Sequence, residues 1–520
     1  MVAACRSYPI FVSAQNKWKM AANGMELYDR YVNTMRKITD IRRSADVLQW
    51  DQETYLPKKS AAIRGRQIAT LTETAHQLFS DDDLGKILED LTGLAELTED
   101  QQKNIERTRE DYLKNKKYSS AFVRTLSEQV NKTFHTWINA REMNLFSIFE
   151  KELDKLIQLK KQESEILGYE SHPYNAHLNE YEKGCTVKFL DEVFDPLLPF
   201  LNELLYKIKQ QPAVDNSFLQ QHFPKQSQWE WGMYIIQQLG FDFEAGRQDI
   251  SEHPFTTSFG PTDVRLTTRI DENDFANMTW SCIHEAGHGL YEQGLPLEQY
   301  GLPLGEYCSL GIHESQSRLW ENNVGRSEHF WKYYYPKLQE FFPDQFKTIS
   351  PEIFYKGINK VEPGLIRTEA DELTYHFHVF IRYELEKKLF EGTLNTADIP
   401  AYWNEMYFKY LGIKVPDDKN GCLQDVHWSH GSFGYFPTYS LGSLYAAQFY
   451  SHINNSIPNL DIDLENGITD KILQWLQQYI YPTGRKYTSN ELCLKVTGES
   501  LNAGHFKDHL LRKFGIIYNL

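Results

Sequence analysis

Apolar side chains recur every three or four positions along most of the chain, which is the spacing of one face of an α-helix. The first such segment leads from Glu26 to Trp50, and we expect it to end before Pro57, because proline cannot continue a helix. Leu94 to Leu167 contains neither glycine nor proline, so we expect long antiparallel helices there. Strict heptads are not sustained, which argues against a coiled coil. The pattern predicts a mostly α-helical protein.

One segment has a different period. From Asp263 to Ile270 apolar and polar residues alternate, with Arg265 and Arg269 on the polar face, and this is typical of a strand with one buried face. Only a short loop separates this strand from the segment described next, so we expect the strand to border it. An exposed edge there can pair with an extended peptide.

The densest chemical pattern is the HExxH motif from His284 to His288. On a helix these two histidines lie on one face, one turn apart, so both imidazoles can bind one zinc ion. Glu285 flanks that face and can reach an attacking water without ligating the metal, as a general base requires. Gly287 and Gly289 each lower helix stability by about 1 kcal/mol, and we expect a substrate or a neighbouring helix to approach the backbone there. On this motif alone, two ordinary histidines on a solvated helix are the alternative.

A zinc hydrolase needs a third protein ligand and an open coordination position. We expect this ligand to be Glu314, thirty positions after His284, at the start of the next predicted helix. A carboxylate ligand leaves the site with one net positive charge, so a bound water can ionise near neutral pH. The neighbouring His313 is the alternative ligand, and a solvated glutamate at a helix start is the alternative interpretation of Glu314.

Peptide hydrolysis also needs hydrogen-bond donors for the developing oxyanion. The Gly-rich segment from Gly421 to Tyr439 places four candidate donors close together in the sequence: His427, His430, Tyr435 and Tyr439. For each of these side chains a role in the core is the alternative.

Arginine is the residue type that binds a carboxylate through two parallel hydrogen bonds. Arg367 is the candidate anchor for a substrate carboxylate, with Arg265 and Arg269 as reserves. An ion pair between Arg367 and Asp371, four residues later, is the structural alternative.

The composition narrows the classes of partner. The formal net charge is −16, which argues against nucleic acid and against an anionic membrane surface, because both require a basic footprint. The six cysteines are scattered without a CxxC pair, which fits a reducing compartment, and we expect a cytoplasmic protein. We expect Cys282 to be a packing residue, because it would lie off the ligand face of the helix. No run of eighteen apolar residues occurs, so no transmembrane helix is expected.

Residues 1–24 carry three basic residues, no acid and no long apolar segment, so a secretory signal is not expected. We interpret this stretch as an extension outside the fold, either disordered, an organellar presequence or the product of an alternative start at Met20 or Met25. No Gly/Ser-rich linker and no internal repeat divides the remainder. We therefore expect residues 25–520 to form one catalytic domain, a helical body split by a groove.

Five motifs together resemble the signature of the M32 metallocarboxypeptidases, the family typified by thermostable carboxypeptidase. The matching stretches occur in the family's order: Asp263–Thr267 for Asp-x-Arg-x-Thr, His284–His288 for HExxH, His313–Gln316 for the third ligand, Ile366–Asp371 for Ile-Arg-x-x-Ala-Asp, and Gly421–Trp428 for Gly-x-x-Gln-Asp-x-His-Trp. Similar sequence also occurs at Trp50–Thr54, so the resemblance extends from about residue 25 to the end of the chain.

The resemblance implies a nearly all-helical fold with a deep groove, a small sheet beside the zinc and a homodimer. It implies removal of single residues from peptides with a free C-terminus, with broad specificity, and one zinc ion per subunit that Co²⁺ can replace. It also implies roles for matching residues: metal ligands His284, His288 and Glu314, general base Glu285, carboxylate anchor Arg367 and, by likeness to the wider group of helical zinc peptidases, oxyanion donors His430, Tyr435 and Tyr439, with His427 as a rival.

Two other functions compete with this expectation. One is a zinc oligopeptidase that cuts internally. The other is a scaffold or binding protein without a metal, against which the intact HExxH motif and Glu314 argue.

Overall fold

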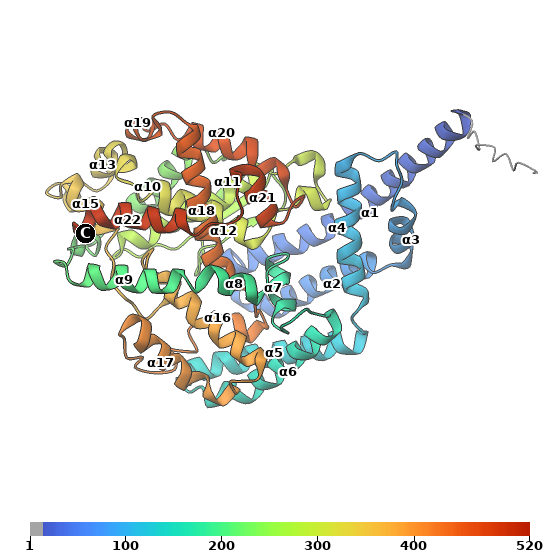
Figure 1. Ribbon diagram of the computed structural model, residues 1–520, viewed down its shortest axis with the longest axis horizontal. Helices are drawn as coiled ribbons and strands as arrows, with labels where there is room; N and C mark the ends of the chain where they lie inside the picture. The colour runs from blue at the N-terminus through green and yellow to red at the C-terminus, as the bar shows by residue number, and fades with distance from the viewer. Residues whose placement is uncertain (1–13) are drawn as a thin grey trace, which may run out of the picture. The chain divides into compact units, whose positions relative to one another are not determined.

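The computed structural model describes the backbone of residues 14–520 and the side chains from Gly24 onward. The chain divides into two compact units (Figure 1). Unit 1 comprises the chain up to Gln52 together with Leu56–Lys116 and Glu298–Glu306, and unit 2 comprises the rest. Of the predicted extension, residues 1–13 lie outside the described residues, and the remainder is the first part of helix α1 (Ala14–Thr54).

Unit 1 is built from helices around its own apolar core. Helix α1 ends at Thr54, before Pro57, as predicted. It is followed by α2 (Ala61–Phe79), α3 (Asp82–Leu91) and α4 (Glu99–Lys116). The hydroxyl groups of Tyr31 and Thr108 are 2.6 Å apart and join α1 to α4 within the core.

Unit 2 begins with two long helices, α5 (Ser120–Met143) and α6 (Ser147–Leu167), which pack side by side (Figure 1). The prediction of long helices between Leu94 and Leu167 is thus confirmed. The chain continues through α7 (Asn175–Tyr181), α8 (Val187–Phe194), α9 (Leu197–Lys209) and α10 (Lys225–Gln238). Pro196 separates α8 from α9, because its ring and missing N–H prevent one continuous helix.

The remaining helices of unit 2 follow a short sheet. They are α11 (Phe275–Gln293), α12 (Leu310–Arg318), the π-helix η5 (Leu319–Val324), α13 (Glu328–Phe341), α14 (Pro343–Phe346), α15 (Pro351–Ile358), α16 (Tyr375–Glu391), α17 (Ile399–Leu411), α18 (Pro437–Ser456), α19 (Leu460–Glu465), α20 (Asp470–Tyr479), α21 (Ser489–Thr497) and α22 (Gly504–Tyr518). The prediction of a mostly helical protein is confirmed.

The sheet has three strands, β1 (Gly246–Ile250), β2 (Thr256–Ser258) and β3 (Val264–Thr268), in the order β1-β3-β2. β3 runs parallel to β1 and antiparallel to β2, with Leu266 opposite both Gln248 and Thr256. The predicted small sheet beside the HExxH segment is confirmed, since α11 packs against β3. β3, the strand predicted from the alternation, is central, so the open edges belong to β1 and β2.

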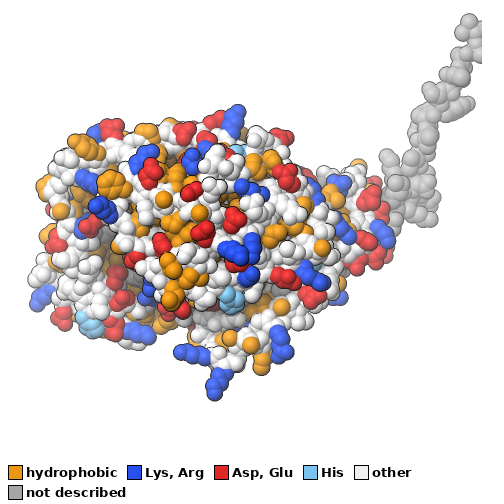
Figure 2. Space-filling model, turned by 90° about the horizontal axis from the view of Figure 1, so that it is seen from below, with side chains coloured by type: hydrophobic (Ala, Val, Ile, Leu, Met, Phe, Trp, Pro, Cys, Tyr) orange, Lys and Arg blue, Asp and Glu red, His pale blue; other side chains and the backbone are white. Residues whose placement is uncertain are grey.

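The visible surface carries both charge signs. In Figure 2, acidic and basic side chains are interspersed over the face shown. No helix among the described residues is long and apolar enough to cross a bilayer. The described cysteines are buried, and Cys282 is fully so, which confirms Cys282 as a packing residue.

Candidate functional site

The HExxH motif lies on α11, whose first turn is capped by a side chain. The carboxylate of Asp274 accepts hydrogen bonds from the backbone N–H groups of Ala276 and Asn277, which fixes where the helix begins. The helix is buried along most of its length, between the sheet on one side and α10 and α12 on others. This burial holds the helix in place despite its two glycines.

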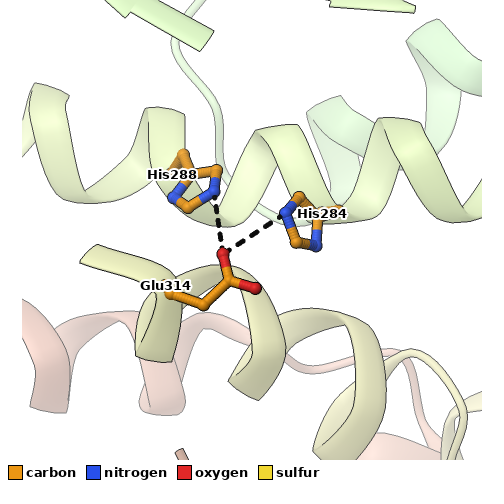
Figure 3. Close-up of side chains that lie close together, drawn as sticks. All are labelled: His284, His288 and Glu314. Atoms are coloured by element: carbon orange, nitrogen blue, oxygen red, sulfur yellow. Dashed lines mark ion pairs between the residues drawn. The ribbon is translucent and has the colours of Figure 1, made fainter. Parts of the chain in front are cut away.

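Three candidate ligands meet between α11 and α12. Figure 3 shows His284 and His288 pointing from α11 toward Glu314 on α12. Glu314 Oε2 lies 3.6 Å from His284 Nε2 and 3.5 Å from His288 Nε2. Donors at 2.0–2.1 Å from one tetrahedral ion would be separated by about 3.3 Å. The geometry of these three side chains therefore fits a zinc-sized ion with one position left open.

The second nitrogen of each histidine is also fixed. His284 Nδ1 is 2.9 Å from Glu321 Oε2, and His288 Nδ1 is 3.0 Å from the carbonyl oxygen of His313. A donated Nδ1–H leaves the Nε2 lone pair free, so these contacts select the tautomer that a metal requires.

His313, the alternative third ligand, is directed elsewhere. Its Nε2 atom is 3.0 Å from Glu292 Oε1, and its ring stacks on His288 with centroids 4.3 Å apart. The structure therefore favours Glu314 over His313.

Two glycines permit this close arrangement. A Cβ atom at Gly287 would lie 2.6 Å from the Cα atom of Ser317, and one at Gly442 on α18 would lie 2.5 Å from Cγ of Glu314. The expectation that a neighbouring helix approaches the backbone at Gly287 is confirmed, and that helix is α12. Gly287 lowers the intrinsic stability of the helix, but it allows α11 to pack closely against α12.

Glu285 faces the sheet side of the site. Its Oε2 atom accepts a hydrogen bond of 2.5 Å from the hydroxyl of Thr256 on β2. Burial raises the pKa of the Glu285 carboxyl, while His284 and Thr256 oppose this shift. The Glu285 carboxyl is thus joined to the edge strand β2 through the side chain of Thr256.

Arginines pair the buried acids around the ligands. Arg318 Nε donates to Glu314 Oε1 at 2.7 Å, and Arg318 Nη1 is 3.2 Å from Glu321 Oε2. Burial by itself would raise the pKa of the Glu321 carboxyl, but Arg318 and His284 lower it to about 2. Glu321 is therefore ionised when it accepts from His284.

Arg367 lies next to this network. Its guanidinium donates to Asp425 Oδ1 at 3.1–3.2 Å and to the Tyr375 hydroxyl at 3.1 Å. The guanidinium of Arg318 lies 4.5 Å from the centre of the same Tyr375 ring. A chain of contacts thus connects Arg367 to Glu314 through Tyr375 and Arg318.

Arg367 pairs with Asp425, and not with Asp371 as the structural alternative for this arginine would require. Asp371 instead accepts hydrogen bonds from the N–H groups of Leu373 and Thr374, just before α16. The partner of Arg367 is Asp425, which is also bound by the buried Arg382. Two guanidinium groups therefore share one carboxylate, which leaves this cluster with one net positive charge.

The reserve arginines are less central. Arg265 pairs with Asp263 at 2.9 Å and lies over the ring of Phe259, and Arg269 is exposed.

The four candidate donors between residues 421 and 439 do not all lie together: three are close to one another, and His430 lies apart. His427 Nε2 lies 3.3 Å from the Tyr439 hydroxyl, and the His427 and Tyr435 rings are 5.2 Å apart. Burial raises the pKa of both tyrosines, and the nearby charge of Glu314 adds to this shift. His430 is exposed and contacts Phe134 of α5 instead. The structure brings His427 rather than His430 to the two tyrosines.

Several residues of this site were missed from the sequence. Arg318 and Glu321 follow Glu314 by four and seven positions, which places all three near one helix face, and this spacing was a usable signal. Asp425 lay within a matched motif, but nothing local indicated its partners. Arg382 and Tyr375 gave no pattern that separates them from core residues.

Known proteins resemble this chain in sequence and fold over nearly its whole length. The family model described as carboxypeptidase Taq (M32) metallopeptidase matches residues 30–514. Carboxypeptidase 1 of Bacillus subtilis is 38% identical over 492 residues, which cover 94% of this chain and 98% of that protein. The solved structure of the protein called CHT has 56% identity and a TM-score of 0.93, covering 94% of this chain and 99% of that one.

The crystal structure of the M32 carboxypeptidase from Deinococcus radiodurans has 35% identity and a TM-score of 0.93, covering 95% of this chain and 100% of that one. The match therefore extends over nearly the whole of both chains, in sequence and in fold. The family is one of metallopeptidases, so a metal cofactor is implied. This chain belongs to the M32 family of metallocarboxypeptidases.

Proposed function

We propose that this protein is a zinc carboxypeptidase that releases single residues from the C-termini of peptides with broad specificity. The observation that carries the proposal is the meeting of His284, His288 and Glu314, with donor atoms 3.5–3.6 Å apart and the second nitrogen of each histidine already bonded. One ion per subunit is expected, and Co²⁺ should replace Zn²⁺ because both accept tetrahedral nitrogen and oxygen ligands.

A zinc ion bound there would polarise the scissile carbonyl and lower the pKa of the attacking water. Glu285 would take the proton from that water and pass it to the leaving amine. Burial keeps the proton affinity of Glu285 above that of an exposed glutamate, which suits a group that must both accept and release a proton. Thr256 would hold the carboxyl in position through its short hydrogen bond.

The terminal carboxylate of the peptide would bind near Arg367. This guanidinium shares Asp425 with Arg382, so the cluster retains one positive charge for an anion. Arg382 is fully buried, whereas the side chain of Arg367 is 6% exposed and contacts Tyr375 and Tyr439 on the side of Glu314. This position supports Arg367 over Arg265 as the anchor.

Oxyanion donors would come from the same side. Tyr435 and Tyr439 are favoured by their closeness to Glu314, and His427 is favoured over His430 by its contact with the Tyr439 hydroxyl. Burial lowers the pKa of His427 to about 3, so it is neutral at physiological pH and can donate from one nitrogen only.

The main chain of the peptide would follow the open edge of β2. This strand contacts Glu285 through Thr256, whereas the predicted strand β3 is paired on both sides. An extended peptide can add to such an edge through backbone hydrogen bonds.

One peptide assayed in two forms tests the proposal. The free-acid peptide should lose its last residue, and the C-terminally amidated peptide should resist cleavage. Chelation should abolish the activity, and Zn²⁺ or Co²⁺ should restore it. Internal cleavage of both forms at equal rates would identify the alternative, a zinc oligopeptidase.

The assembly and compartment are also proposed. We expect a homodimer, which sedimentation analysis would test, and a cytoplasmic location, which the small number and scattered positions of the cysteines support. The net charge of −16 supports the expectation that nucleic acid and membranes are not partners.

A further inference from the structure

The residue that holds His284 lies on an unusual helical turn. Helix α12 passes directly into the π-helix η5, all six residues of which are buried. The backbone N–H of Gly325 donates to the carbonyl of Trp320, five residues earlier, at 2.8 Å. π-turns are rare, and where they occur they often lie at functional sites. Here the turn carries Glu321, which contacts His284.

The support comes from the C-terminal helix α22. Lys513 Nζ donates to the carbonyl oxygen of Asn322 at 2.9 Å and pairs with Glu372 Oε2 at 2.6 Å. His509 lies one turn earlier. Its Nδ1 atom is 3.3 Å from the side-chain nitrogen Nδ2 of Asn323, and its Nε2 atom is 2.8 Å from Glu372 Oε1. Lys513 and His509 therefore each bind the π-turn directly, and both also bind Glu372.

These contacts are made by groups that are costly to bury. The side chains of Lys513 and Glu372 are 5% and 6% exposed, and a lysine is rarely buried so deeply unless it is paired. The buried carbonyl of Asn322 also requires a donor, which Lys513 supplies. Because Glu372 lies just before α16, the clamp joins α22, η5 and this loop at one point.

We propose that Lys513, His509 and Glu372 are positioning residues that clamp the π-turn and so hold Glu321 against His284. The C-terminal helix then sets the affinity of the site for its metal without touching a ligand. This inference rests on the proposed metal site. Loss of a residue that supports a metal-binding histidine typically lowers metal affinity 10–100-fold, and we expect the indirect clamp to act at the lower end of that range.

The test measures zinc affinity directly. Lys513→Met keeps most of the length of the side chain and removes its charge, and the dissociation constant for Zn²⁺ is obtained by competition with a chelator. The measurement is made at a temperature at which circular dichroism shows each metal-free variant to be folded. We expect the constant to rise about tenfold. Lys507→Met is the matched control on the same helix, because Lys507 Nζ contacts Pro196 and not the π-turn, and its constant should stay unchanged.

A double variant separates positioning from general structure. If Lys513 acts through Glu321, Lys513→Met should change zinc affinity little in a Glu321→Gln background, so the two effects do not add. Unchanged affinity in Lys513→Met, or fully additive effects in the double variant, would overturn the clamp. Failure of the unmodified chain to bind Zn²⁺ would overturn the metal site and the clamp together, and is recognised because it precedes any substitution.

Discussion

The metal end and the anchor end of the site are built differently. At the metal end, His284, His288 and Glu314 come from two helices that are neighbours in the chain. The close approach of these helices at Gly287 brings the three side chains together. At the anchor end, Arg367 and Asp425 are 58 positions apart and meet only through a buried ion pair that also includes Arg382.

This difference separates function from stability. At the metal end, α11 and α12 pack closely at Gly287, and Arg318 keeps Glu321 as a partner when Glu314 is removed, so a ligand can be lost while the fold remains. At the anchor end the charged side chains also fix the loop that they belong to, and a broken buried pair leaves an uncompensated charge. Substitutions at the metal end should therefore affect chemistry more than stability, and those at the anchor end should affect both chemistry and stability.

The largest effect is expected from Glu285→Gln at the metal end. The amide keeps the shape and the contact with Thr256 but cannot accept the proton, so turnover should fall about 10²–10⁴-fold. Zinc content and melting temperature should remain those of the unmodified protein. Glu292→Gln, two turns later on α11, is the matched control. Near-normal turnover of purified Glu285→Gln would contradict the assignment of the base.

The next effect concerns the third ligand. Glu314→Ala should weaken zinc binding beyond the roughly 10–100-fold typical for loss of an outer-shell partner, because it removes a ligand itself. Circular dichroism should show the helices intact, and His313→Ala should retain a full equivalent of zinc. The reverse result, in which His313→Ala loses the metal and Glu314→Ala keeps it, would mean that the neighbour was misassigned.

A pH effect on stability is expected from Glu386 at the anchor end. This buried carboxyl accepts hydrogen bonds from Trp428 and Gly434, and burial raises its pKa from 4.5 to about 7 despite them. The folded state therefore holds this proton more tightly than the unfolded state. Its stabilising contribution is complete below pH 4.5 and is lost as the pH rises to about 7, a change of roughly 3 kcal/mol.

Comparison of variants isolates this contribution. The free energy of unfolding, measured in urea, should fall less for Glu386→Gln than for the unmodified protein as the pH rises from 4.5 to 7. Glu405→Gln, an exposed position on α17, should follow the unmodified protein. Parallel curves for Glu386→Gln and the unmodified protein would show that Glu386 titrates alike in the folded and unfolded states.

The smallest effect is expected from Arg367→Ala. Loss of one charge-assisted contact should weaken transition-state binding by about 1.5–3 kcal/mol. For a free-acid peptide, kcat/KM should then fall about ten- to over a hundred-fold. Residual cleavage of the amidated peptide should change little, because that substrate has no carboxylate to bind. Equal losses on both substrates, together with a lowered melting temperature, would mean that Arg367 acts mainly by holding Asp425.

The sequence by itself determined what depends on short spacing. The helical period predicted the long helices, the alternation from Asp263 predicted β3, and the HExxH motif with Glu314 predicted side chains that do meet, because residues four positions apart share a helix face. The tertiary structure decided the rest. It paired Arg367 with Asp425 rather than Asp371, made β3 a central strand, directed His427 rather than His430 toward the tyrosines, and placed Lys513 against the carbonyl oxygen of Asn322. Those outcomes depend on which buried charges and edges face each other across distant segments, and no local period in the chain encodes such contacts.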